Sequence, residues 1–216
     1  MDPIADIFDF KWWQLFIVFA LFYIIVIYLS NQVTYTDAYY YSAYGNQFNA
    51  EQVEKMIAAK NKYSWLIYAI FPLTLFLKLV IVALIIYTGA LLFNKAITYK
   101  NCLKIVVLAE LSSILAAMTT MICFSIHPPR TLQDVQSFAP LALIQLTGIK
   151  SLPAYLVYPI KLINVFEAGY WILLILGVSH YIKDSAKRSF ALVASSYGVS
   201  LFIWALFIVF IQLQFT

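Results

Sequence analysis

Long stretches without any Asp, Glu, Lys or Arg dominate this sequence, at residues 12–36, 79–94, 111–126, 168–182 and 189–216. The hydrocarbon core of a bilayer is roughly 30 Å thick, so a helix needs about 20 mostly apolar residues to cross it. Because no water reaches the backbone there, each crossing segment must be a helix that satisfies its own N–H and C=O groups. The sequence therefore predicts an all-α polytopic membrane protein with five transmembrane helices.

The composition favours a single integral membrane domain over residues 1–216. Only 11% of the residues are charged, against roughly 25% in a soluble domain. The loops are too short to form a second, soluble domain. We expect helices at about 12–30, 74–94, 105–126, 162–182 and 190–213, with two longer outer connections at 31–73 and 127–161.

Lysine and arginine gather in two short loops, which sets the expected orientation. The loop 95–104 has three lysines and no acid, and the loop 183–189 has three basic residues against Asp184. Five crossings put both loops on one side of the membrane, and the excess of basic residues predicts that this side is cytoplasmic. The N-terminus is then cytoplasmic and the C-terminus outside.

Both outer connections contain apolar segments whose placement the sequence leaves open. Asn49 and Gln52 have the spacing of a capping box, and the segment 49–73 fits an outward extension of the second helix better than a helix on the membrane surface. Pro72 is able to kink or break this segment. Residues 138–149 are too short to span, and a buried loop helix, an interfacial helix and a re-entrant piece all fit.

Three ionisable residues, Lys78, Glu110 and Glu167, fall at membrane depth, where such groups are costly and are functional candidates. With about 1.5 Å of rise per residue, Lys78 and Glu167 lie at nearly the same depth. A Lys78–Glu167 ion pair is one hypothesis. The alternative is that Lys78 reaches the outer headgroups alone, and Lys161 is a competing partner for Glu167.

Small and polar residues mark two expected packing faces. Ser113, Ala117 and Thr120 share a helix face with Glu110, which favours helix packing over a proton-linked or substrate-facing carboxylate. Ala194 and Gly198 form a small-xxx-small pair, which permits close approach of two helices. Packing within the chain is favoured over dimerisation there, although the sequence does not separate the two.

Motifs that would indicate catalysis or metal binding are missing from the sequence. It has no Gly-rich phosphate loop, no G-x-S-x-G and no H-E-x-x-H. His127 and His180 are expected near opposite faces of the membrane, and Cys102 and Cys123 lie too far apart along one helix for a disulfide. We therefore expect no catalytic residues, no cofactor and no metal site. The positive charge is confined to two short loops, so no nucleic-acid partner is expected either.

The C-terminal third resembles the Yip family, the Ypt/Rab-interacting proteins. The segment NVFEAGYWILLILGVSHYIKDSAKRSFALVASSYGVSLFIWALF (164–207) contains a Phe, a hydrophobic run ending in Gly, a short basic loop and a final helix. Phe166, Gly177 and the KDSAKR loop match these features, and APLAL (139–143) is a weaker echo. Gly169 departs from the family pattern, because a Trp is frequent there.

The resemblance implies five helices with the same orientation, and a bacterial-type member in the cytoplasmic (inner) membrane. It implies no catalytic residue. Some bacterial members are thought to accompany ABC-type exporters, so membrane lipids and such an exporter are the expected partners. The first hypothesis is a non-enzymatic accessory or scaffolding subunit of a transport or envelope assembly. The second is a small transporter or channel that uses Glu110, Glu167 and Lys78.

Overall fold

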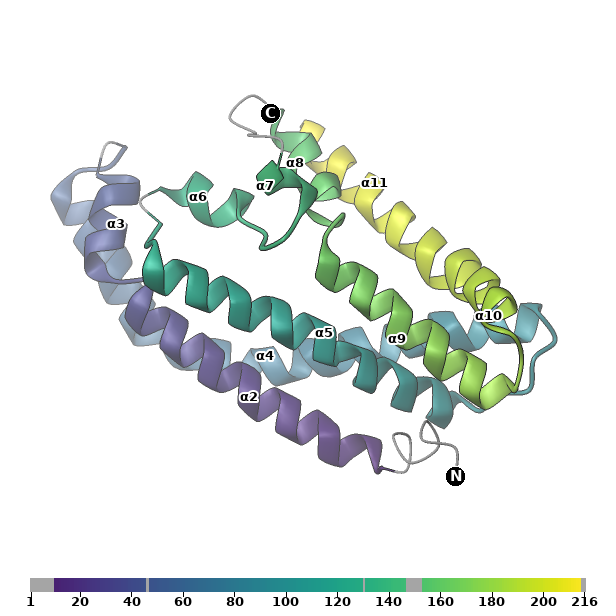
Figure 1. The fold of residues 1–216 in the computed structure, drawn as a ribbon. Coiled ribbons are helices and arrows are strands. Elements are labelled where there is room, and N and C mark those ends of the chain that lie inside the picture. The colour runs from purple at the N-terminus through teal and green to yellow at the C-terminus, as the bar shows by residue number, and fades with distance from the viewer. Residues whose placement is uncertain (1–9, 46, 130, 147–152, 215–216) are drawn as a thin grey trace.

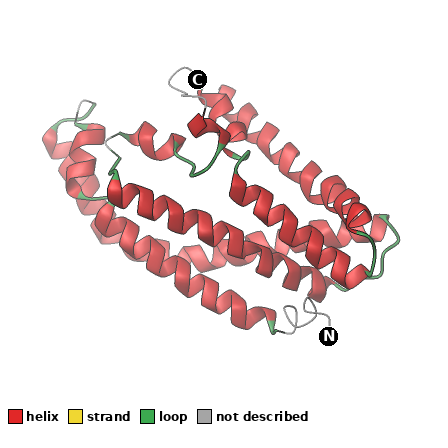
Figure 2. Ribbon diagram, viewed as in Figure 1, coloured by secondary structure: helices red, strands yellow, loops and turns green. Residues whose placement is uncertain are grey.

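The computed structural model describes residues 10–45, 47–129, 131–146 and 153–214. These residues form helices and loops without a β-strand (Figure 2). Five helical segments are long and apolar enough to cross a membrane. They are α2 (Trp12–Val33), α4 (Ala50–Leu92), α5 (Tyr99–Ile126), α9 (Val165–Ile182), and the continuous segment of α10 (Ala186–Val193), the π-helical turn η1 (Ala194–Gly198) and α11 (Val199–Gln214). The five-helix prediction is confirmed.

The core lies where α5 meets its neighbours. α5 packs most extensively against α9 and also contacts α2 and α4, as Figure 1 shows. Small residues permit the closest approaches. A Cβ added at Gly177 of α9 would lie 2.6 Å from Cγ2 of Ile105 in α5, and Ile105 is completely buried.

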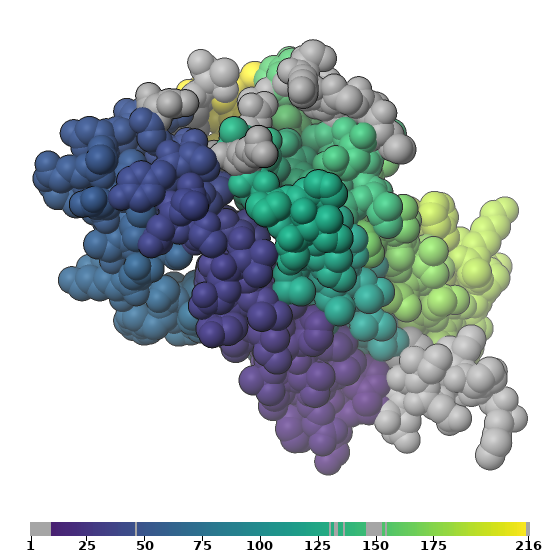
Figure 3. All heavy atoms as spheres, turned by 60° about the vertical axis from the view of Figure 1, so that its left-hand side comes forward, coloured from purple at the N-terminus to yellow at the C-terminus, as the bar shows by residue number. Residues whose placement is uncertain are grey.

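The two long connections, 31–73 and 127–161, are more helical than the sequence predicted. Residues 31–73 are not a loop: α3 (Asp37–Tyr44) is followed by α4, which runs without a break from Ala50 through Pro72 to Leu92. The capping box of Asn49 and Gln52 is confirmed, and so is the extension of the second helix, while the separate surface helix is wrong. In Figure 3, α3 and the first turns of α4, in blue, protrude beyond α2 and α5.

The second long connection contains α6 (Leu132–Ser137), α7 (Leu143–Leu146) and α8 (Ala154–Lys161). Within the predicted apolar segment 138–149, Ala142 and Ile144 are buried and Leu141 is exposed. Ala142 also forms an isolated antiparallel bridge with Asn164, at the start of α9. These contacts fit the loop helix of our three alternatives, whereas residues 147–149 lie outside the described part of the chain.

The two basic loops lie at the same end of the bundle, as predicted, because they bind each other. The Lys95 ammonium donates to Asp184 Oδ2 at 2.7 Å, and Arg188 Nη1 donates to Oδ1 of the same carboxylate at 3.2 Å. The hydrogen bond from Lys95, and then that from the Ser185 backbone N–H, lower the pKa of Asp184 from 3.8 to about 2. We call this end, defined by residues 95–104 and 183–188, the basic end.

The lowered pKa of Asp184 predicts a pH-dependent stability difference between Asp184→Asn and the wild type. A depressed carboxyl pKa stabilises the fold above the unfolded pKa, and this contribution is lost as pH falls through the folded pKa. The thermal midpoint of the variant should therefore be lower than that of the wild type at about pH 7, and the gap should close towards about pH 2. A constant gap across this range, measured by thermal unfolding in detergent, would argue against the ion pair.

Candidate functional site: a polar cluster inside the bundle

Glu110 is the centre of the site, and α5 holds it facing the bundle interior with only 1% of the residue exposed. Lys78 of α4 donates to both carboxylate oxygens at 2.9 Å. The Tyr23 hydroxyl of α2 donates to Oε1 at 3.0 Å. Three transmembrane helices are thus tied together by one carboxylate, which satisfies the requirement that a buried charge be paired and hydrogen-bonded.

The expected Lys78–Glu167 ion pair is wrong, and so is the expectation that Lys78 reaches the headgroups alone. The sequence predicts a third helix that begins at residue 105, but the helix begins at Tyr99, which places Glu110 about 9 Å deeper. Glu110 then lies near the level of Lys78. Depth along the membrane normal also does not give the direction in which a side chain leaves its helix. Glu167 is at a suitable depth, but it projects from α9 in a direction other than towards Lys78.

Glu167 has partners of its own at the start of α9. The side chain of Asn164 caps this helix by accepting from the Glu167 backbone N–H at 2.7 Å. Glu167 Oε1 in turn accepts from Trp171 Nε1 at 3.0 Å and from the Tyr197 hydroxyl, in η1, at 2.8 Å. This carboxylate therefore joins α9 to the last transmembrane segment.

Aromatic rings connect the two carboxylates into one cluster. The Lys78 ammonium lies 5.7 Å from the ring centroid of Tyr170, and the Tyr170 ring is 5.4 Å from that of Tyr197. The Tyr170 hydroxyl is buried and has no hydrogen-bond partner among the described residues. The three ionisable residues that the sequence singled out thus belong to one site, although they are paired differently from the prediction.

The predicted packing residues lie in mixed surroundings. Ser113 neighbours the Tyr23 hydroxyl, Ala117 packs against the core, and the Thr120 hydroxyl bonds within its own helix to the Ala116 carbonyl. Gly198 contacts Trp171 so closely that an added Cβ would lie 2.6 Å from its ring, whereas Ala194 is half-buried. Packing of Gly198 is therefore intramolecular.

Several residues of the site could not be singled out from the sequence. Tyr23, Tyr170 and Tyr197 lie in uncharged segments rich in aromatic residues, where tyrosine is common without a specific role. Cys102 and Cys123 are free thiols, as predicted. Among the described residues no three His, Cys, Asp or Glu side chains are placed to hold a metal ion.

The sequence matches no family model, and no curated protein or solved structure matches it. The fold and the site define a class: a helical membrane protein with five helices long and apolar enough to cross a bilayer. These helices are joined internally through Glu110, which is buried, and Glu167, which is half-buried.

Two tyrosines at the cluster give a matched test of this geometry. Tyr23→Phe removes a hydrogen bond to Glu110 and should cost about 1 kcal/mol, in the range of hydrogen bonds inside membranes. Tyr170→Phe removes a hydroxyl that has no partner and should leave the free energy of unfolding unchanged or slightly raised. Unfolding in mild detergent measures both, and equal losses would contradict the assigned bonds.

Proposed function

We propose that the chain is a non-enzymatic integral membrane protein of the Yip type. It serves as an accessory or scaffolding subunit, in contact with other membrane proteins and with lipids, in a transport or envelope assembly. The proposed location is the bacterial inner membrane, with the basic end and the N-terminus on the cytoplasmic side.

The bare surface of α11 is the observation that carries this proposal. Among its described residues only Ala205 is buried. Large apolar side chains are exposed along it: Val199, Phe202, Ile203, Trp204, Leu206, Phe207, Phe210 and Leu213. α11 contacts α8 and η1 and lies along one edge of the bundle in Figure 1. A helix that its own chain covers so little offers its length to lipid or to a partner's helix.

The polar cluster supports the same proposal, because its charges are engaged within the chain. Lys78 and Glu110 bind each other, and Glu167 binds Trp171 and Tyr197. Neither the groove beside α11 nor the pocket next to α6 is lined by any of these charged residues. The cluster therefore fits a device that fixes the helices better than a passage for a solute.

Site-specific photo-cross-linking tests the proposal. A photoreactive residue at the exposed position Phe207 should yield one defined adduct with another membrane protein, and the same protein should copurify after gentle solubilisation. The buried position Ala205 of the same helix is the matched control and should yield no adduct. Adducts with lipid alone at Phe207, together with no copurifying protein, would refute the accessory role.

A small transporter or channel is the second candidate, favoured by one observation. Lys78, Glu110 and Glu167 share a cluster with a buried hydroxyl that has no partner, that of Tyr170. Transporters place polar groups near the midplane of the bilayer in this manner. For this candidate, Glu167→Gln should abolish solute flux into proteoliposomes in protein that still folds and unfolds cooperatively.

A further inference from the structure

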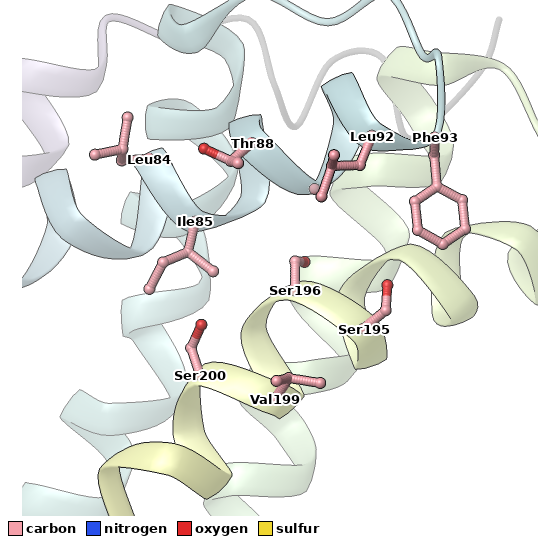
Figure 4. Close-up of a pocket in the computed structure, with 10 residues that line it drawn as sticks. Leu84, Ile85, Thr88, Leu92, Phe93, Ser195, Ser196, Val199 and Ser200 are labelled. Atoms are coloured by element: carbon pink, nitrogen blue, oxygen red, sulfur yellow. The ribbon is translucent and has the colours of Figure 1, made fainter.

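A groove of about 360 Å³ follows the line where α4 crosses the last transmembrane segment. Gly89 and Ser196, both buried, form its floor, and a Cβ at Gly89 would lie 2.5 Å from the Ser196 Cβ. Figure 4 shows the lining residues, with Ile85 of α4 pointing towards Ser200 of α11. The walls comprise Leu84, Ile85, Thr88, Leu92, Phe93, Ser195, Val199 and Ser200.

The groove combines an apolar lining with the hydroxyl groups of Thr88, which is exposed, and Ser200, which is half-buried. The hydroxyls of Thr88 and Ser200 make no hydrogen bond with any described residue, while those of Ser195 and Ser196 bond to the Leu192 carbonyl. An unsatisfied hydroxyl is costly inside a bilayer. The preferred occupant is therefore a molecule with acceptor oxygens at this depth and an apolar remainder.

The groove itself is lined by uncharged residues, but the basic end lies close to it along both helices, which favours a molecule with a negative charge. Leu92 and Phe93 are two or three residues from Lys95, and Ser195 is seven residues, about 10 Å of helix, from Arg188. The loops of the basic end contain six basic residues and one carboxylate. Lys183 and Lys187 are exposed and form no ion pair with a described residue, so their ammonium groups are available to an anion.

We propose that this groove binds an anionic phospholipid of the leaflet at the basic end. Its phosphate lies at the basic end, within reach of Lys183 and Lys187. An ester carbonyl accepts from the Thr88 hydroxyl, and an acyl chain follows the groove past Leu84, Ile85 and Ser200. Clusters of basic residues beside transmembrane helices bind such headgroups. The inference deepens the proposed function and rests on it, because it specifies the lipid that the accessory protein contacts.

Lipid retention tests the proposal in the full-length protein. We would reconstitute the protein into vesicles of phosphatidylcholine with a minority of phosphatidylglycerol, extract it gently and measure bound lipid by native mass spectrometry. The wild type should retain phosphatidylglycerol in preference. Thr88→Leu with Ser200→Leu fills the groove and should lower this retention about tenfold. Thr74→Leu, at an exposed position of α4 whose hydroxyl bonds to Phe71, is the matched control and should retain the lipid.

Removing the charges of two lysines distinguishes binding of the headgroup from binding of the acyl chain in the groove. Lys183→Gln with Lys187→Gln should keep a bound lipid but lose the preference for phosphatidylglycerol. The same change at Lys55 and Lys62, exposed on the extension of α4, should keep the preference. Equal retention by the wild type and the filled groove, or a protein helix in place of lipid there, would overturn the proposal. Adduct formation at Phe207 tests the accessory role separately, so the lipid proposal and the accessory role can each fail without the other.

Discussion

Replacing Lys78 by methionine is expected to destabilise the protein by about 3 kcal/mol, because it leaves the buried carboxylate of Glu110 without its charged partner. The reason is the burial of Glu110, whose side chain is 2% exposed and would keep only the hydrogen bond from Tyr23. Glu110→Gln should cost less. The Lys78 side chain is 47% exposed, and its ammonium can turn towards a polar surface when its partner is removed.

A double-mutant cycle measures this coupling. Lys78→Met combined with Glu110→Gln should recover most of the stability that Lys78→Met loses, since no unpaired buried charge remains. The matched comparison is Lys78→Met with Glu167→Gln, for which the two losses should simply add. Reversible unfolding in mild detergent gives all the free energies of unfolding. Coupling to Glu167 instead of Glu110 would show that the ion pair is misassigned.

Replacing Gly177 by alanine should cost about 1–3 kcal/mol, the usual penalty for overpacking a core. The new methyl group would lie 2.6 Å from Cγ2 and 2.8 Å from Cγ1 of Ile105. Ile105 is fully buried where α5 and α9 make the most extensive helix contact. It therefore has little freedom to move away.

The second-site change Ile105→Ala removes the two atoms that the new methyl group meets. The double variant should be more stable than the sum of the two single losses predicts. Ala168→Val, at an exposed position of the same helix, is the control and should be nearly neutral. Thermal unfolding compares the four variants. A loss at Ala168→Val as large as at Gly177→Ala would show that the loss is not specific to the contact with Ile105.

Much of the fold was predictable because the thickness of the bilayer sets how many consecutive apolar residues a crossing helix needs. Uninterrupted apolar length gave five helices, and the lysine-rich loops gave a common end, which the Lys95–Asp184 ion pair confirms. The extension of α4 followed from the capping box at Asn49. All of these features depend on residues that are close together in the chain.

The arrangement of the site was not predictable to the same degree. The direction of a side chain around its helix axis decides whether Glu110 or Glu167 meets Lys78, and depth counting contains no such information. The predicted depth of Glu110 also depends on where α5 begins. The side chain of Thr98 sets this start, because it caps the helix by accepting from the Asn101 backbone N–H. The groove beside η1 arises because Gly89 meets Ser196, two residues that are distant in the chain.

The central claim is that the charges of the polar cluster hold the helices in place and that the proposed accessory function resides on the exposed surface of α11. Photo-cross-linking from Phe207, in a variant with Lys78→Met and Glu110→Gln, tests this claim most directly. We predict the same adduct, in the same yield, as with the wild-type cluster. A variant that folds and unfolds like the wild type but yields no adduct would contradict the claim.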